Sequence, residues 1–491
     1  MVRVLAVVAG AVLVVAAWWQ VFAASADLTE VSVDRGGVPV TLLLPPAEEP
    51  VPGVVVAHGF AGSGQLMRSF GLALADAGYA VALVDLSGHG ANRRPLGDDR
   101  DDDRLVADVT SALAALRERP EVDDRLALLG HSMGAGVVLR TGIEAPDDIR
   151  ALVAVSPTDA AVTSRVPPDL LLVAGEREPR FVANAEELLE RAGGVRGAPG
   201  DGDARALEVI PGVEHVCILF SPTSHRVAVA WLDAALEHES TRSPAVAVIG
   251  WWIAHLVGVL LIWRALASAV LPQPTSVRVG QARVGQARVS PARALIGLIG
   301  GGLVAVGALA GLVAALPVAG LGGLLVAPLL AAWFAVAGAA WLLAGARPPA
   351  LTTSDLPVAA LLLVVLVAAF GLLAQHVWLP WFPIAPRAVR APVLALLILP
   401  WTVAWAATLD GRRGPAGFAW WAAVSAGALL GVGIAALVVP ALGFVMLLLP
   451  LLPALLGLAQ VVSAPAGRPW AAAIATAAFL GWTLAVLFPL A

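Results

Sequence analysis

The chain of 491 residues contains one cysteine and no lysine, so every basic side chain is an arginine or a histidine. A single cysteine, Cys217, excludes a disulfide within the chain. Charged residues make up only 14% of the sequence, against about 25% in ordinary soluble domains. The formal net charge of −5 gives no reason to expect nucleic acid as a partner. So little charge is typical of a chain that is partly embedded in a membrane.

The shortage of charge is confined to one part of the chain. Between residues 294 and 491 the charged residues are Arg347, Asp355, Arg387, Arg390, Asp410, Arg412, Arg413 and Arg468. Residues 25–243 have the composition of an ordinary soluble domain. The sequence therefore predicts three parts, which are an N-terminal segment (1–24), a soluble domain (25–243) and a polytopic membrane region (244–491).

The N-terminal segment is apolar from Val4 to Ala24, about the length that a helix needs to cross a bilayer. Residues 23–26, Ala-Ala-Ser-Ala, resemble the cleavage site of a secretory signal peptide. The apolar run is longer than that of a usual signal peptide. We therefore favour an uncleaved transmembrane anchor over a removed signal sequence.

Eight further apolar stretches follow the soluble domain, which makes nine expected spans in all. They are 245–271, 294–316, 320–346, 356–375, 391–409, 417–438, 440–461 and 470–490. Between the first two of the eight, residues 279–288 repeat Val-Gly-Gln-Ala-Arg in tandem. We interpret the repeat as a linker, and a basic contact with anionic lipid headgroups is the alternative.

The loop arginines predict the orientation, because cytoplasmic loops carry an excess of positive charge. If Arg3 is cytoplasmic and the nine spans alternate, the loop arginines fall on the cytoplasmic side, with the exceptions of Arg387 and Arg390. The arginines that agree are Arg264, Arg278, Arg283, Arg288, Arg293, Arg347, Arg412, Arg413 and Arg468. We therefore expect a multi-pass protein of the cell membrane with residues 25–243 outside the cytoplasm.

Within the soluble part, short apolar runs alternate with segments of helical pattern. The expected strands are Val38–Leu44, Gly53–Ala57, Ala80–Asp85, Arg125–Leu129, Ile149–Val155, Asp169–Ala174 and Ala206–Ile210. The expected helices are Gln65–Ala77, Arg104–Arg119, Met133–Ile143, Phe181–Ala192 and Pro222–His238. This order predicts an α/β fold with a mainly parallel sheet flanked by helices, followed by an all-α transmembrane domain. Sites in such sheets lie beyond the carboxyl ends of the strands.

One motif in this part carries chemistry. Residues 130–134 read Gly-His-Ser-Met-Gly, between an expected strand and an expected helix. This is the setting of a nucleophile elbow, in which glycines two residues either side of the serine allow a sharp turn. The pattern predicts Ser132 as a nucleophile.

A serine nucleophile needs a base within hydrogen-bonding reach, and histidine is the usual one. Among the eight histidines, His215 follows the last expected strand in Pro-Gly-Val-Glu-His. His225 and His238 lie in or at the end of the following helix, where structural roles are expected. His131 adjoins Ser132, but neighbouring side chains on an elbow diverge. We therefore predict His215 as the base.

The base needs an acid to orient it. Glu178 follows the expected strand at 169–174 and is our prediction for the acid. Glu176 and Asp159 remain alternatives for the acid. A non-catalytic alternative is that the segment around Glu178 is an exposed acidic loop whose carboxylates pair with nearby arginines.

The oxyanion of a tetrahedral intermediate needs backbone N–H donors. The sequence predicts the N–H of Met133, next to the nucleophile, and that of Phe60. Phe60 lies in the glycine-rich loop after the strand at 53–57. A purely structural turn is the alternative for this loop.

Taken together, residues 30–240 resemble an α/β-hydrolase. The resemblance rests on His58-Gly59, on Asp85 to Gly90 (Asp-Leu-Ser-Gly-His-Gly), on the elbow, and on the order Ser132, acid, His215. It implies hydrolysis of esters, thioesters or amides, with occasional acyl transfer. A glutamate at 178 departs from the usual aspartate. No insertion is long enough for a cap domain, so a loop lid is expected. Asn92 to Arg104, with Asp98, Asp99, Asp101, Asp102 and Asp103, could border the site or form a solvated acidic loop.

The leading hypothesis is a membrane-anchored serine hydrolase that cleaves an ester-type bond, namely a carboxylic ester, a thioester or a lipid acyl bond. The alternatives are a transporter or membrane scaffold with a non-catalytic hydrolase-like domain, and an acyltransferase. The expected partners are a small-molecule or lipid ester and membrane lipids. No cofactor and no metal ion are expected.

Overall fold

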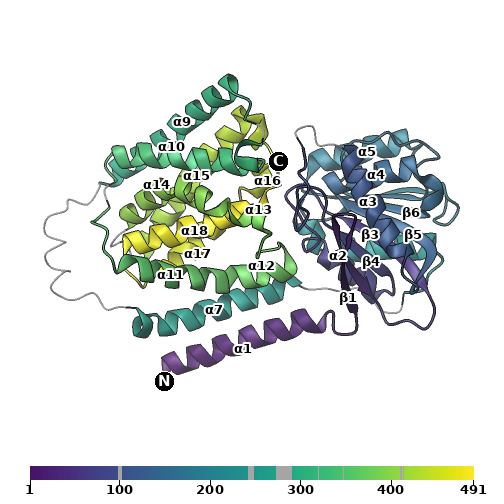
Figure 1. Cartoon of the computed structure of the whole chain (residues 1–491), viewed down its shortest axis with the longest axis horizontal. Coiled ribbons are helices and arrows are strands. Elements are labelled where there is room, and N and C mark those ends of the chain that lie inside the picture. The colour runs from purple at the N-terminus through teal and green to yellow at the C-terminus, as the bar shows by residue number, and fades with distance from the viewer. Residues whose placement is uncertain are drawn as a thin grey trace.

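The computed structural model describes residues 1–97, 102–240, 248–271, 290–318, 320–346, 348–409, 412 and 414–491. It has an α/β part and a helical part, which lie side by side (Figure 1). Several residues that the sequence singled out lie outside these ranges. They are Asp98, Asp99, Asp101, Asp410, the repeat at 279–288, and the loop arginines Arg278, Arg283, Arg288, Arg347 and Arg413.

The α/β part is built on one eight-stranded sheet. Its strands are β1 (Thr29–Arg35), β2 (Val38–Leu44), β3 (Val51–Ala57), β4 (Ala80–Val84), β5 (Val122–His131), β6 (Ala151–Val155), β7 (Leu170–Gly175) and β8 (Arg205–Ile210). Their order in the sheet is β1-β2-β4-β3-β5-β6-β7-β8. The pairs β1–β2 and β2–β4 are antiparallel, and all the others are parallel. The predicted α/β fold with a mainly parallel sheet is confirmed.

The strand β1 was not expected from the sequence. It lies at the edge of the sheet, and its side chains are exposed except for Val31 and Val33, which are partly buried. An edge strand needs only one weakly apolar face, so the run Thr-Glu-Val-Ser-Val-Asp-Arg gives little signal.

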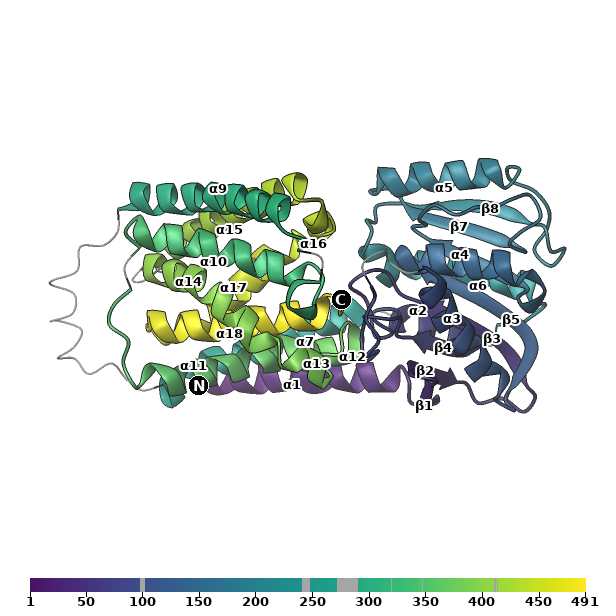
Figure 2. The same ribbon diagram turned by 45° about the horizontal axis from the view of Figure 1, so that its top comes forward.

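Helices cover both faces of this sheet (Figure 2). One face carries α3 (Asp102–Arg117), α4 (Met133–Glu144) and α5 (Pro179–Arg191), and the other carries α2 (Arg68–Asp76) and α6 (Pro222–Ala235). Successive side chains of β5 point to opposite faces of the sheet. Leu128 packs with α3, α4 and α5, and Leu129 packs with α2 and α6. The sheet is thus buried on both faces, with its carboxyl edge left to hold a site.

In the helical part, seven helices of the described residues are long and apolar enough to cross a membrane. They are α1 (Val2–Ala23), α7 (Val248–Val270), α9 (Pro291–Ala315), α11 with α12 (Asp355–Val377), α13 with α14 (Ala385–Leu409), α15 (Pro415–Val438) and α18 (Pro469–Leu487). The helix α1 packs closely on α7. A Cβ on Gly10 would lie 2.6 Å from the carbonyl oxygen of Gly258.

Two expected spans differ from simple crossing helices. Residues 440–461 form a pair of helices, Pro440–Leu448 and Leu451–Ser463 (α17), bent by 61°. Pro450 lies at the bend and cannot donate a helical hydrogen bond. In the expected span 320–346, the helix α10 (Ala327–Leu343) has only 17 residues, because Gly320, Gly322 and Gly323 adopt positive φ in a turn before it. The count of nine spans therefore stays a prediction.

Candidate active site

Ser132 stands on the sharp turn between β5 and α4. Its φ of 54° is rare for a residue with a side chain, and its backbone N–H donates to the carbonyl oxygen of Val155 over 2.9 Å. A Cβ on Gly130 would lie 2.3 Å from the Gly134 oxygen, and one on Gly134 would lie 2.5 Å from the oxygens of Ala57 and His58. Only glycine fits at these two positions, which explains the motif physically.

Three side chains that lie far apart in the sequence meet at this turn. The Nε2 atom of His215 lies 3.1 Å from Ser132 Oγ, and its Nδ1 atom lies 2.7 Å from Glu178 Oε2. All three residues are less than a tenth exposed. The ring of Phe181 stacks on the imidazole of His215, with 4.2 Å between the ring centres. The imidazole is therefore held between a hydroxyl and a carboxylate in a largely dry setting.

Glu178 is itself fixed by two further donors. Its Oε1 atom accepts hydrogen bonds from Ser156 Oγ and from the Gly175 backbone N–H, both at 2.6 Å. The alternative acids are engaged elsewhere. Glu176 accepts from the Gly212 N–H at 2.7 Å, and Asp159 forms an exposed ion pair with Arg191. Among the three candidate acids, the structure brings Glu178 to His215.

The alternative histidines have structural partners. His225 is buried, with its Nε2 2.9 Å from the carbonyl oxygen of Leu219. His238 Nε2 lies 3.0 Å from the carbonyl oxygen of Ala77. The Nε2 of His131 lies 3.0 Å from the backbone oxygen of His215. The sequence predicts that His215 meets Ser132, but it does not predict that the neighbouring His131 contacts the backbone of the same loop.

The loop after β3 lies directly against the serine. A Cβ on Gly59 would be 3.1 Å from Ser132 Cβ. His58 holds the base of this loop, since its Nδ1 lies 2.8 Å from the Gly59 oxygen and its Nε2 accepts from the Leu86 N–H at 3.1 Å. Burial lowers the pKa of His58, against the opposing effect of Asp85. A neutral imidazole fits this pattern of one donor and one acceptor.

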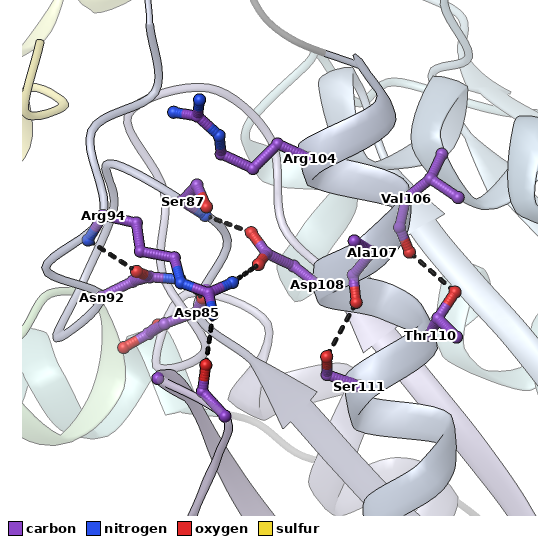
Figure 3. A network of polar contacts seen from close by, with 12 residues as sticks. Asp85, Ser87, Asn92, Arg94, Arg104, Val106, Ala107, Asp108, Thr110 and Ser111 are labelled. Atoms are coloured by element: carbon purple, nitrogen blue, oxygen red, sulfur yellow. Dashed lines mark hydrogen bonds and ion pairs between the residues drawn. The ribbon is translucent and has the colours of Figure 1, made fainter.

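A second loop, residues 85–96, packs against the first and is held by two carboxylates, of which Figure 3 shows Asp108 with its partners Ser87 and Arg94. Asp85 accepts from the backbone N–H groups of Gly64 and Ala91, both at 2.7 Å. Asp108 Oδ2 on α3 accepts from the Ser87 N–H at 2.7 Å, and Asp108 Oδ1 lies 3.4 Å from Arg94 Nη1. Burial raises the pKa of Asp108, and its partners offset part of that rise. The second loop is thereby tied both to the loop beside Ser132 and to α3.

The helical part contributes a third set of contacts, which the sequence did not reveal. Arg387 of α13 is only 1% exposed. Its guanidinium donates to the Gly90 oxygen at 3.2 Å, to the Ala485 oxygen at 3.1 Å, and to the oxygens of Gly88 and Phe488. The sequence had marked Arg387 only as an exception to the charge rule for loops. Its position is explained by four carbonyl oxygens at the junction of the two parts.

No group of three or more His, Cys, Asp or Glu side chains in the described ranges is arranged to hold a metal ion. The predicted oxyanion donors, the N–H groups of Phe60 and Met133, lie in the loop beside Ser132 and at the first residue of α4. Their role stays a prediction. The start of a helix favours a developing negative charge.

Comparisons with known proteins place the likeness in the α/β part. Residues 48–186 match the family model described as "Serine aminopeptidase, S33". Epoxide hydrolase A of Mycobacterium tuberculosis is 32% identical over 202 residues, which are 38% of this chain and 60% of that protein. The chain thus spans less than two thirds of that relative's length.

Solved structures match the same part. A dienelactone hydrolase from Anabaena variabilis is 19% identical, with a TM-score of 0.33, and the match covers 43% of this chain and 99% of that one. Epoxide hydrolase A from Mycobacterium thermoresistibile is 18% identical, with a TM-score of 0.34, and the match covers 44% of this chain and all of that one.

Proposed function

Because the N-terminal part of this chain is an α/β-hydrolase domain and its C-terminal part is a region of many long apolar helices, we propose that the protein is a membrane-bound serine hydrolase of ester-type bonds. The observation that carries the proposal is the imidazole of His215, which lies between Ser132 Oγ at 3.1 Å and Glu178 Oε2 at 2.7 Å. A hydroxyl, an imidazole and a carboxylate in this order form a catalytic triad.

The mechanism follows from the order of these three groups. The Ser132 hydroxyl attacks the ester carbonyl while His215 Nε2 takes its proton, and Glu178 stabilises the imidazolium. The N–H groups of Phe60 and Met133 bind the oxyanion. The tetrahedral intermediate collapses to an acyl-serine as His215 returns the proton to the leaving alkoxide. Water then attacks the acyl-serine by the same route, releasing the acid and restoring Ser132.

A labelling experiment tests this assignment. A fluorophosphonate probe should label the full-length protein in membranes, and Ser132→Ala should abolish the labelling. His215→Ala should lower turnover of a short-chain ester by several orders of magnitude, whereas His225→Ala should leave most of the turnover in folded protein. Labelling that survives Ser132→Ala would overturn the proposal, and so would folded wild-type protein that is not labelled at all. That last result would favour a non-catalytic, scaffold-like domain.

We further propose that the hydrolase domain lies outside the cytoplasm. Arg3 lies at the start of α1 and Arg468 caps α18, and both helices begin at the end of the helical part that is remote from the hydrolase domain (Figure 1). Positive charge favours the cytoplasmic side. Reporter fusions test the orientation. A reporter that is active only outside the cytoplasm should be active when fused after Gly200. A reporter that is active only inside the cytoplasm should be active when fused after Gly285. A cytoplasmic position for the first would contradict it.

A further inference from the structure

The helical part packs directly on the loop beside Ser132. The Ser63 hydroxyl donates to the carbonyl oxygen of Trp378 at 3.1 Å. The ring of Phe60 lies edge-on to that of Phe444, with 4.8 Å between the ring centres. Leu325, which precedes α10, packs against the same hydrophobic core of the hydrolase domain as Phe60 and Met133. One side of the candidate site is therefore walled by residues of the helical part.

An apolar groove lies in the helical part, next to residues that make these contacts. Its lining includes Val445, Leu448, Leu449, Leu452, Leu484 and Phe488. Val445 follows Phe444, which touches Phe60, and the Phe488 oxygen accepts a hydrogen bond from Arg387. Two points of the lining are thus next to contacts with the hydrolase loops.

The bend in the helix pair shapes this groove. Pro440–Leu448 and Leu451–Ser463 meet at 61°, and leucines on either side of the break line the groove. Its volume is about 60 Å³. Since a water-sized group needs roughly 10–15 Å³, the groove has room for about five such groups. That matches a short length of acyl chain better than a bulky polar molecule.

We propose that this groove binds the acyl chain of a lipid ester whose carbonyl lies at Ser132. The inference rests on the proposed hydrolase function and adds the class of substrate to it. The chain would pass the rings of Phe60 and Phe444 and lie along the apolar lining, where Thr483 is the one polar residue. Ser132 is only 9% exposed, and in this proposal a substrate dissolved in the bilayer reaches it from the side of the helical part.

Chain-length dependence of the full-length protein in detergent tests the proposal. The substrates are p-nitrophenyl esters from acetate to octanoate. Each buried methylene should raise kcat/KM about fourfold, until the groove is filled. Val445→Phe should remove this gain and lower kcat/KM for octanoate at least tenfold, while acetate turnover and fluorophosphonate labelling stay unchanged. The matched control is Met446→Phe, which enlarges a neighbouring residue of the same short helix that is 42% exposed and is expected to keep the wild-type profile.

The outcomes separate the two proposals. A wild-type chain-length profile in folded Val445→Phe would overturn the groove while leaving the hydrolase intact. Absence of acetate turnover and of labelling in the wild type would instead overturn the hydrolase. If Val445→Phe does not fold, Leu484→Phe narrows the groove from α18 with the same expected loss. A wild-type profile in that variant would overturn the groove equally.

Discussion

The Nε atom of Arg387 lies 3.2 Å from the carbonyl oxygen of Gly90, although 297 positions separate the two residues. The contact joins a helix of the apolar region to loop 85–96, which packs against the loop beside Ser132. The same loop is bound from the C-terminal end of the chain. The Leu490 N–H donates to the Gly88 oxygen at 2.8 Å, and the Leu96 N–H donates to the Leu490 oxygen at 3.0 Å. The helical region is thus part of the scaffold that fixes the site.

Replacing Arg387 by alanine tests this scaffold. The variant loses four charge-assisted hydrogen bonds. The Gly88 oxygen keeps the Leu490 N–H as a donor, but buried oxygens such as that of Gly90 lose the Arg387 donor, and each unsatisfied acceptor costs about 1–3 kcal/mol. We expect the thermal midpoint of the detergent-solubilised protein to fall by at least about 5 °C. Turnover of p-nitrophenyl acetate should fall about tenfold, because the loops at 58–64 and 85–96 lose a common support.

Arg390→Ala is the matched control. Arg390 lies three residues further on, and donates to the oxygens of Gly322 at 2.7 Å and of Pro386. Both partners belong to the helical region, so this variant should keep its acetate turnover within about twofold. If Arg387→Ala also keeps its turnover, the hydrolase domain does not depend on the helical region for its site.

The identity of the triad acid leads to a second prediction. Glu178→Gln removes the negative charge but keeps the shape, and should lower kcat for p-nitrophenyl acetate by about 10²–10⁴-fold. Asp159→Asn removes a carboxylate that is paired with Arg191 at the surface, and should change kcat less than twofold. A large loss in Asp159→Asn together with a small one in Glu178→Gln would reverse the assignment.

A buried histidine makes stability depend on pH. Burial lowers the pKa of His225 from 6.5 to about 4. Between these values the unfolded chain binds a proton that the folded chain does not, so stability falls with decreasing pH. The contribution, about 3 kcal/mol, is fully present above pH 6.5 and is lost as the pH falls toward 4.

Thermal midpoints at pH 7.5 and pH 5 check this prediction. His225→Phe should show a smaller drop between the two conditions than the wild type, whatever its midpoint at pH 7.5. His238→Phe, a change of equal size beyond the end of the same helix, should keep the wild-type drop. An unchanged drop in His225→Phe would mean that His225 is not a source of the acid sensitivity.

The sequence was most informative where one residue type is physically required. The strand Val38–Leu44 was predicted with its observed bounds, because a buried strand reads as a continuous apolar run. The glycines at 130 and 134 marked the turn at Ser132 because no Cβ fits there. Such signals are local, and they hold whatever the rest of the chain does.

Contacts between distant segments leave no such local signal in the sequence. Neither the hydrogen bond from Arg387 to Gly90 nor the contact of Phe60 with Phe444 leaves a pattern in the neighbouring residues. The divergence of neighbouring side chains on an elbow argues against His131 as the base, but it does not predict that His131 Nε2 lies 3.0 Å from the backbone oxygen of His215. These features depend on the relative placement of two parts of the fold, which periodicity and spacing do not encode.

Covalent catalysis by Ser132 can be observed by trapping the acyl-enzyme. The full-length protein is mixed with excess p-nitrophenyl butyrate, quenched in acid within the first turnovers, digested and analysed by mass spectrometry. We expect a butyryl group on the peptide that carries Ser132, enriched in the wild type and absent from Ser132→Ala. Turnover of the ester with no acyl group on that peptide, or with the group on another residue, would contradict it.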